Sequence, residues 1–332
     1  MTTIKDIARM ADVSKSTVSK VINDYPGINK ETRKKILKIM EENNYFPNAT
    51  ARSLSTKISK TIGIFDPGRL NNFFFRDVME GIEDYLGKKG FNILYFTNKA
   101  WGETWVNFSF TEKARNRNVD GVLMMGFGDI DLAQFKKLVQ SSIPAVFIDI
   151  ELEGKRTTYI TSDNAAGARS AVEYLYKKGH KKIGIIRGPY GFKPADKRFK
   201  GYREKLNELG LTYNPDWVFS REYFQREGKK CINSFLKMSD LPTAFFCQDI
   251  FAVGAIKELQ KRGYRIPEDF SFVGFDDIEL SEHYGLTTIR QKKEKIGREA
   301  ARTLLNIIYD EEFSPVIVPT ELVERSSCKK ID

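Results

Sequence analysis

The stretch that decides the fold of the N-terminal region is residues 4–23, which read IKDIARMADVSKSTVSKVIN. The apolar residues of its first half have the i, i+3, i+4, i+7 spacing of one helix face: Ile4, Ile7, Ala8 and Ala11. Those of its second half predict another short helix: Val18, Val21 and Ile22. Thr3 and Ser14 precede the two helices where N-caps are expected. Two short helices joined so tightly predict a helix-turn-helix, whose second helix lies in the DNA major groove.

The second helix presents an outward face that is wholly small, polar or basic. Its members are Lys15, Ser16, Thr17, Ser19 and Lys20. Such side chains can reach phosphates and base edges. The alternative is a small helical pair whose polar face is merely solvated.

The segment that follows predicts a third helix and then a linker. Asn29–Thr32 resembles a helix start, and apolar residues continue at helical spacing to Met40. The pattern ends before Pro47, which disfavours helix at the residue before it. Residues 48–56 read NATARSLST and predict a short hinge helix that is marginal on its own. Leu54 is an apolar residue in this polar linker, as in minor-groove binders that insert a wedge between base steps.

Positive charge is concentrated in the same region. Residues 1–60 hold 12 Lys+Arg and 6 Asp+Glu, whereas the whole chain of 332 residues carries a net charge of +10. More than half of the excess therefore lies in less than a fifth of the length. This concentration is the electrostatic footprint of a DNA-binding unit.

From residue 61 onward, short apolar runs alternate with amphipathic stretches, which predicts parallel sheets covered by helices. The expected strands form two sets: 61–65, 91–96, 121–125 and 145–149, then 182–187, 217–219, 244–247 and 270–274. The expected helices are 74–88, 164–178, 195–209 and 249–262, with a further helix over 288–310.

Composition indicates a soluble multidomain protein and argues against an enzyme. The chain is 41% hydrophobic and 30% charged. Its three cysteines are expected to be buried thiols in a reducing compartment. No signal peptide or membrane-length apolar run is apparent, so a cytoplasmic location is expected. With two histidines, no metal-ligand spacing and no P-loop, we expect no catalysis, metal or cofactor.

The whole chain resembles the LacI/GalR family of bacterial transcription regulators. The head and hinge carry the resemblance in IKDIARMADVSKSTVSKVIND (4–24) and NYFPNATARSLS (44–55). It continues in VDGVLMMG (119–126), QDIFAVGAI (248–256), FSFVGFDD (270–277), LTTIRQ (286–291) and ELVERSS (321–327). The head is most similar to the purine-responsive branch of the family, and the remainder departs from that branch.

The resemblance implies a helical helix-turn-helix head and an α/β core of two parallel-sheet lobes like a periplasmic binding protein. The expected domains are a head over 1–47, a hinge over 48–60 and an effector-binding and dimerisation domain over 61–332. Lobe one is expected at about 61–159 plus 290–318, and lobe two at about 162–287 plus 321–332. Crossover strands are expected near 159–162, 287–290 and 318–321.

The resemblance also implies a homodimeric repressor bound to a near-palindromic DNA operator. The base-reading residues are expected to be Lys15, Ser16 and Lys20, with Thr17 close by. The phosphate contacts are expected to be Thr3, Ser14, Ser19, Asn23, Tyr45 and Asn48. Leu54 is expected to enter the minor groove with support from Arg52. No heptad helix follows ELVERSS, which favours a dimer over a tetramer.

A small-molecule effector is expected in the cleft between the lobes, because ligands of open α/β sheets bind at the carboxyl ends of strands. Asp249 follows an expected strand and starts a helix, so its carboxylate is the first candidate contact. The family pattern adds four more: Phe74, Phe75, Arg198 and Tyr223. The structural alternatives are a helix N-terminal carboxylate for Asp249, an ion pair for Arg198 and core packing for the phenylalanines.

The expected effector is a sugar or sugar phosphate. Phe192, Pro194 and Ile150 replace residues that the purine-responsive branch uses, which argues against a purine. A purine effector, a protein cofactor on lobe one, a free-standing sugar-binding receptor and a sugar-processing enzyme stay open as alternatives. Whether the effector induces or corepresses is also open.

Overall fold

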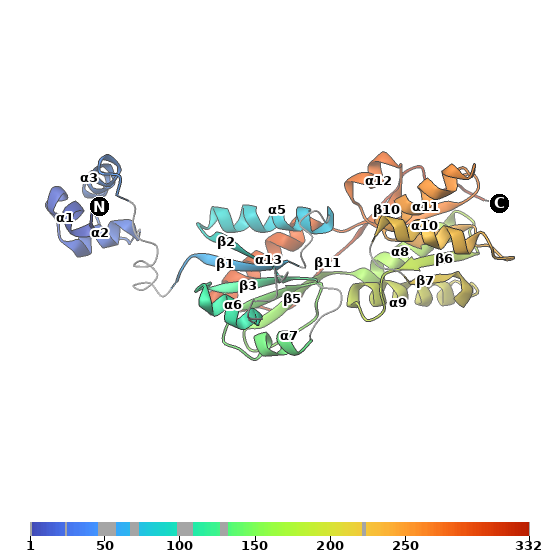
Figure 1. Ribbon diagram of the computed structural model, residues 1–332, viewed down its shortest axis with the longest axis horizontal. Coiled ribbons are helices and arrows are strands. Elements are labelled where there is room, and N and C mark those ends of the chain that lie inside the picture. Colours follow the sequence, from blue (N-terminus) through green and yellow to red (C-terminus); the bar gives the residue numbers. More distant parts are fainter. Residues whose placement is uncertain are drawn as a thin grey trace, which may run out of the picture. The chain divides into compact units, whose positions relative to one another are not determined.

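A computed structural model describes residues 2–23, 25–45, 58–66, 73–97, 109–126, 132–220 and 224–331. The chain divides into two compact units, and each is described by itself. The first comprises residues 1–61 with 118–120, and the second comprises 62–117 with 121–332. Figure 1 shows their helices and strands, with labels on most of them.

The first unit is built on three helices, α1 (Ile4–Ala11), α2 (Lys15–Ile22) and α3 (Lys30–Glu42). All three predicted helices of the head are therefore confirmed. Their inward residues form one small core: Ile7, Ala8, Ala11, Val18, Val21, Ile36 and Met40. A core of this size buries the apolar stripe of each helix and leaves the opposite faces to solvent.

Side-chain caps start each of these helices where the sequence predicts them. Thr3 accepts a hydrogen bond from the backbone N–H of Asp6, whose carboxylate accepts one in return from the Thr3 N–H. The Ser14 hydroxyl accepts from the Thr17 N–H at 3.1 Å. The Asn29 side chain accepts from the Thr32 N–H at 2.7 Å. Each cap satisfies a backbone donor that the helix itself leaves unpaired.

The predicted hinge contacts lie outside the described residues, which stop at 45 and resume at 58. This applies to Asn48, Arg52 and Leu54. After this gap the Asp120 carboxylate fixes the start of β1. It accepts hydrogen bonds from the backbone N–H groups of Ser59 at 2.7 Å and Thr61 at 3.3 Å.

The second unit contains two six-stranded sheets. The first has the order β11-β5-β4-β3-β1-β2, and we call the part built on it lobe one. Its strands are β1 (Thr61–Asp66), β2 (Asn92–Thr97), β3 (Gly121–Met125), β4 (Ala145–Ile148), β5 (Thr157–Ser162) and β11 (Val316–Val318). The pairs β1–β3, β3–β4, β4–β5 and β5–β11 are parallel.

Alternate residues of the lobe-one strands pack on different helices. Ile62 and Ile64 of β1 belong to a core shared with α5 (Phe73–Lys88) and α13 (Lys293–Ile308). Phe65 instead packs edge-on to Phe110 of α6 (Phe110–Asn116). From there an aromatic series runs through Phe135 of α7 (Leu132–Val139) to Phe147. The period of two in a strand therefore sorts the side chains between two helical layers.

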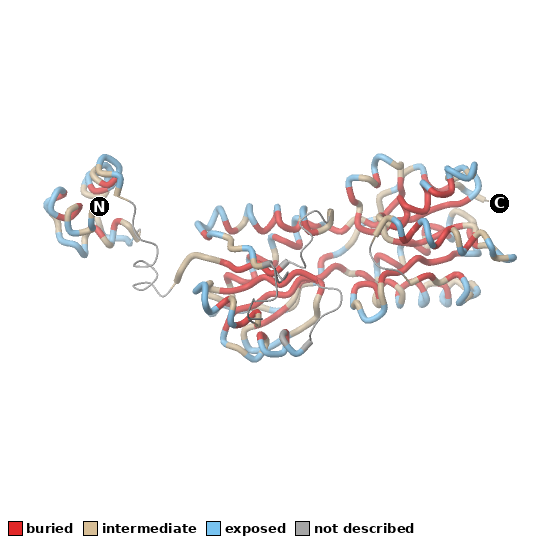
Figure 2. Tube along the Cα trace, viewed as in Figure 1, coloured by how far each residue is buried: buried red, intermediate tan, exposed pale blue. Residues whose placement is uncertain are grey.

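The second sheet has the order β12-β10-β9-β8-β6-β7, and the part built on it is lobe two. Its strands are β6 (Ile183–Arg187), β7 (Val218–Ser220), β8 (Ala244–Cys247), β9 (Ser271–Asp276), β10 (Thr287–Arg290) and β12 (Glu321–Val323). The β10–β12 pair is antiparallel, while β6–β7, β6–β8, β8–β9 and β9–β10 are parallel. Figure 2 shows the strands of both sheets as largely buried.

Helices cover both faces of this second sheet. Ile183, Ile185 and Phe246 face α8 (Asn164–Lys177) and α9 (Lys193–Glu208). Their neighbours in the same strands, Ile186 in β6 and Phe245 in β8, point to the other face of the sheet. They pack against α10 (Gln225–Phe235) and α11 (Asp249–Lys261). A short α12 (Glu279–His283) follows β9. The predicted parallel-sheet architecture is confirmed for both lobes, and the three cysteines are free and buried as predicted.

One expected element is wrong at its start. The helix predicted from residue 288 begins instead at Lys293, because Thr287–Arg290 is strand β10 between β9 and β12, in agreement with the crossover strand that the family resemblance implied near 287–290. Several elements had no predicted range of their own in the strand and helix patterns: α6, α7, α10 and α12. They are short or lie beside irregular sequence, where periodicity is weak.

Glycines bring α5 and α13 unusually close. A Cβ on Gly297 of α13 would fall on the backbone carbonyl oxygen of Val78 in α5, and one on Gly81 would fall on that of Glu294. Gly87, also in α5, has open space around it. The two crossing glycines therefore hold the first turns of α13 against lobe one.

We predict that Gly297→Ala destabilises the protein by about 1–3 kcal/mol, because the added methyl group overpacks a backbone contact. Gly87→Ala is the matched control in the same helix pair. It should stabilise by about 0.5–1 kcal/mol, since alanine loses less entropy in a helix than glycine. Urea denaturation of both variants measures these changes. Equal effects of the two substitutions would contradict the close approach of the helices.

Candidate functional site

The outward face of α2 carries charge that its own helix does not neutralise. Lys15, Ser16 and Lys20 are exposed, and α2 contains no acidic residue. The described part of the head contains the ion pairs Arg9–Asp6 and Lys38–Glu42. Neither Lys15 nor Lys20 takes part in an ion pair there. The two lysines are therefore free to meet an anionic surface, while the Ser16 hydroxyl lies 2.7 Å from that of Ser14.

The other predicted DNA contacts of the head have additional structural roles. Thr3 and Ser14 cap α1 and α2. The Asn23 side-chain amide donates to the carbonyl oxygen of Ser19 at 2.9 Å, and Tyr45 packs partly against the head core. Thr17 is half-buried and lies 2.8 Å from the Ser14 hydroxyl. Their contacts to DNA stay predictions.

A buried charged cluster lies where the carboxyl ends of strands from both lobes meet. Asp149 follows β4 of lobe one, Asp276 ends β9 of lobe two, and Arg198 lies on α9. Their exposed fractions are only 7%, 6% and 6%. Arg198 Nη1 lies 3.6 Å from Asp276 Oδ1, and its guanidinium stacks 4.5 Å from the centre of the Phe275 ring. We call these three residues the interlobe cluster.

Burial controls the protonation of this cluster. It raises the pKa of Asp149 to about 6, although a 2.8 Å hydrogen bond from Thr161 and the charge of Arg198 oppose the shift. Burial also raises the pKa of Asp276, against the charge of Arg198 and a hydrogen bond from Gln291. A buried carboxylate is tolerated only where hydrogen bonds and opposite charge compensate for lost hydration.

Two glutamines extend the cluster. Gln248 precedes α11 and donates to Asp276 Oδ2 at 3.0 Å, while Gln291 follows β10 and donates to Asp276 Oδ1 at 2.6 Å. The Oε1 atoms of both glutamines are buried and accept no hydrogen bond within the described structure, and Arg198 Nη1 donates none there. Buried polar atoms are nearly always satisfied, so these atoms keep hydrogen-bonding capacity for a polar ligand or water.

The backbone at this edge is in an unusual conformation. Asp149 has a φ of 63°, Asp276 a φ of 117° and Asp277 a φ of 50°. Positive φ at residues other than glycine costs free energy and is concentrated at binding sites. At these three aspartates the backbone therefore leaves the extended conformation of the strands.

Asp249, the first predicted effector contact, is fully buried in a different set of bonds. Its carboxylate accepts from the Ile278 N–H at 3.0 Å, the Ser281 hydroxyl at 2.7 Å and the Thr288 hydroxyl at 2.6 Å. Burial and the nearby charge of Asp276 raise its pKa to about 7. In this arrangement it ties α11 to the segment after β9 and to β10. Direct contact with an effector would require one of these bonds to be replaced.

The other predicted effector residues have mixed positions. Arg198 lies within the interlobe cluster. Phe75 is buried in the lobe-one core, and Phe74 packs against that core with its ring 5.3 Å from Phe75. Tyr223 lies outside the described residues. The effector roles of all these residues stay predictions.

Sequence analysis missed three of the polar residues at this edge as candidate contacts: Asp149, Gln248 and Gln291. It named Asp276 only as part of the FSFVGFDD motif that carries the family resemblance. All of them stand at or just beyond the end of an apolar strand: β4, β8, β9 or β10. Reading the polar residue after each strand end would have found them, because those ends converge at one edge.

Other chemistry is not evident in the described residues. Among them, no group of His, Cys, Asp and Glu side chains could hold a metal ion. His180 is buried, with Nδ1 2.8 Å from the Thr243 hydroxyl, and burial lowers its pKa. A search of the described helices found none with the length and apolarity to cross a membrane.

Comparison with known proteins matches both parts of the chain. Residues 3–48 match the model of the bacterial regulatory proteins of the lacI family, and residues 172–328 match a periplasmic binding protein-like domain. The chain is 36% identical to the HTH-type transcriptional repressor PurR of Aliivibrio salmonicida (strain LFI1238), with 100% of both chains covered. It is 37% identical to the ribose operon repressor of Haemophilus influenzae (strain ATCC 51907 / DSM 11121 / KW20 / Rd), with 98% of each covered.

Solved structures agree over nearly the full length. The Lac repressor dimer bound to operator and the anti-inducer ONPF superposes with a TM-score of 0.82 at 25% identity, covering 99% of each chain. The complex of the transcriptional regulator CelR with cellobiose gives a TM-score of 0.72 at 26% identity, covering 98% of this chain and 100% of that one. The expected family and fold are confirmed, and these relatives are transcriptional regulators rather than enzymes. The chain belongs to the LacI family of bacterial regulatory proteins.

Proposed function

We propose that a small hydroxylated molecule, a sugar or sugar phosphate, binds at the interlobe cluster and controls the operator affinity of this DNA-binding repressor. The observation that carries the proposal is the set of unsatisfied buried polar atoms around Arg198 and Asp276. A ligand with several hydroxyl groups would donate to the glutamine and carboxylate oxygens and accept from the guanidinium. Such convergent polar groups are typical of small-molecule sites.

A purine is the second candidate effector, and the similarity to the PurR repressors favours it. The ribose operon repressor and the cellobiose-bound CelR support the sugar. Acceptors outnumber donors in the cluster, because two carboxyl groups and two free amide oxygens surround one guanidinium. This balance suits a ligand rich in hydroxyl donors. Phe192, which contributes an apolar ring near Gly126 and Asp149, also favours a sugar, since apolar rings pack on sugar faces.

The head supplies the DNA contact in this proposal. α2 would lie in the major groove, with Lys15, Ser16 and Lys20 toward base edges and phosphates. Thr17 would stand close by, and the phosphate set would be Thr3, Ser14, Ser19, Asn23, Tyr45 and Asn48. A homodimer would place two heads on a near-palindromic operator, with Leu54 and Arg52 of each hinge at the central minor groove.

Coupling between the two sites requires two lobe arrangements with different ligand affinities. Some contacts between the lobes would differ between the two arrangements. Lys197 of α9 pairs with Glu151 after β4, and the charge of Arg198 acts on Asp149. A ligand that favours one arrangement by about 1–3 kcal/mol would change operator affinity five- to 150-fold.

We predict that Lys15→Ala and Lys20→Ala each weaken operator binding and reduce the salt slope by about 0.9, because each removes one phosphate-neutralising charge. Lys35→Ala is the control, since Lys35 is an exposed lysine on α3 of the same head. Titration of an operator fragment at several salt concentrations gives both quantities. If Lys35→Ala lowers affinity as much as the α2 variants, α2 is not the reading helix.

We predict that Gln248→Leu weakens effector binding at least tenfold while operator affinity of the free protein stays within about twofold. The substitution removes one unsatisfied acceptor and a neighbour of Asp276 at a half-buried position. A thermal-shift screen of sugars, sugar phosphates and purines first identifies the effector, because a ligand of the native state raises its stability. Titration calorimetry then measures affinity. Gln260→Leu, an exposed glutamine of α11, serves as control, and equal binding by both variants would exclude the interlobe cluster.

Asp249 predicts a dependence of stability on pH. Its pKa of about 7 lies above its ordinary 3.8, so the native state binds more protons than the unfolded state between these values. Its contribution to stability is therefore lost as pH rises from about 4 to 7. Asp249→Asn removes this loss, and the fall in unfolding free energy from pH 5 to 8 should shrink by at least about 1 kcal/mol.

Urea denaturation at the two pH values tests this. Asp149 and Asp276 contribute with the same sign in both proteins, so the difference reports the loss of the Asp249 carboxyl group together with its charge on Asp276. Parallel pH profiles would contradict the raised pKa. The same variant tests the predicted effector contact, because a purely structural tie leaves effector affinity at pH 8 unchanged.

A further inference from the structure

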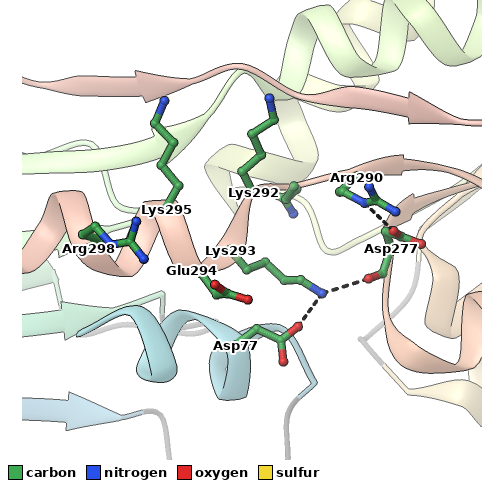
Figure 3. A pocket seen from close by; sticks show the side chains of 9 residues that line it. Asp77, Asp277, Arg290, Lys292, Lys293, Glu294, Lys295 and Arg298 are labelled. Carbon is green, nitrogen blue, oxygen red and sulfur yellow. Dashed lines mark hydrogen bonds and ion pairs between the residues drawn. The ribbon is translucent and has the colours of Figure 1, made fainter. Parts of the chain in front are cut away.

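A pocket lies at the start of α13, where the chain enters lobe one from β10. It has a volume of about 390 Å³, which is within the range of small-molecule sites. Asp77 of α5 borders it from lobe one, and Asp277 after β9 borders it from lobe two. We call it the α13 pocket; Figure 3 shows the side chains that line it.

The two aspartates of the α13 pocket are already compensated. Asp77 pairs with Lys293 at 2.7 Å and with Arg76 at 3.1 Å. Asp277 pairs with Arg290 at 2.6 Å and Arg325 at 2.8 Å, and its carbonyl oxygen accepts from the buried Lys293 ammonium at 2.9 Å. Figure 3 shows Lys293 between the two aspartates. Neither carboxylate therefore has charge left to neutralise the remaining lysines.

Those remaining cations are held only loosely. Lys292 lies 3.8 Å from Glu321, and Arg298 lies 3.9 Å from Asp84, with both side chains substantially exposed. Lys295 has no ion pair with any residue that the structure describes. Figure 3 shows Lys292 and Lys295 projecting to the same side of the start of α13. Glu294 is the one acid on the lining without such a compensating pair, so the lining is left with net positive charge.

Backbone and buried polar atoms of the α13 pocket also favour a ligand that carries an anionic group and hydroxyl groups. Lys292 is the N-cap of α13 and makes no side-chain cap, so the positive end of a 16-residue helix is uncapped there. Gln291 also lines the α13 pocket, is only 3% exposed and has a buried Oε1 that accepts no hydrogen bond in the described structure. Helix N-termini bind anions, and a free amide oxygen accepts from a hydroxyl group.

We propose that the α13 pocket is a second ligand site, which binds a small phosphate monoester that also carries free hydroxyl groups. The phosphate group would lie at the start of α13, among Lys292, Lys295 and Arg298. A hydroxyl group would donate to Gln291 Oε1. Because the pocket has walls from both lobes, bound ligand and lobe arrangement influence each other by linkage. The two sites share Gln291, whose Nε2 donates to Asp276 of the interlobe cluster, so the test uses lysine variants of the α13 pocket alone.

The double variant Lys292→Gln/Lys295→Gln tests the α13 pocket in the full-length protein. Both lysines are exposed, so folding should survive, and a thermal melt checks that. The control is Lys136→Gln/Lys261→Gln, which removes the same charge from exposed positions on α7 and α11. Calorimetric titrations use three probes: inorganic phosphate, glycerol 3-phosphate and glycerol.

The wild type and the control should bind glycerol 3-phosphate more tightly than inorganic phosphate, and the pocket variant should bind it at least tenfold more weakly. Glycerol should not distinguish the proteins. If inorganic phosphate binds as tightly as the ester, the hydroxyl contact is wrong and the ligand is free phosphate. The site itself is wrong if the wild type binds neither anion at 10 mM. Equal loss of affinity in both double variants would mean nonspecific attraction of anions to the positively charged protein and would also exclude the site. The site is likewise wrong if the pocket variant binds glycerol 3-phosphate as tightly as the wild type.

Discussion

Two carboxyl groups and a guanidinium are buried together where the lobes meet, and this constrains the rest of the core. Arg198 cannot be left there without a counter-charge, and Asp276 lies 3.6 Å from it. Removing charges from water costs several kcal/mol each, which only good geometry and added hydrogen bonds offset. The lobes must therefore hold Asp149, Asp276 and Arg198 in register. A ligand that enters this cluster necessarily changes the balance among them.

That balance connects ligand chemistry to the arrangement of the lobes. Ion pairs join the lobes at two separate places: Lys197–Glu151 and Arg76–Glu279. Each is compatible with one relative placement and would have to re-form in another. A LacI-family repressor needs such discrete arrangements, because a ligand shifts an equilibrium only by its differential affinity for the states. The fold of the head does not have to change when the lobes rearrange, because its small core and its helix caps are formed by its own residues.

Local sequence signals account for most of the fold. Thr3, Ser14 and Asn29 start the three head helices, as the order of capping residue and apolar stripe predicts. Eight strands of the two sheets appear within a few residues of the predicted apolar runs, whereas β5, β10, β11 and β12 lie at or next to the crossover strands that only the family resemblance implied. β10 also fell inside a predicted helix, because TTIR is compatible with a helix by periodicity, and its pairing with β9 and β12 makes it a strand. Short segments whose partners are distant in sequence are decided by pairing rather than by propensity.

The sequence by itself determined the helix-turn-helix head, the alternating core and the family, because these depend on periodicities and motifs within short windows. It pointed to Arg198, yet it chose Asp249 over its neighbour Gln248. Only tertiary structure decided which partners each of them has: the chain buries Asp249 among Ile278, Ser281 and Thr288, whereas Gln248 donates to Asp276. Adjacent polar residues at a strand end look equivalent in one dimension. Which one joins the interlobe cluster depends on where residues about 30 positions away supply hydrogen bonds, and no local pattern contains that information.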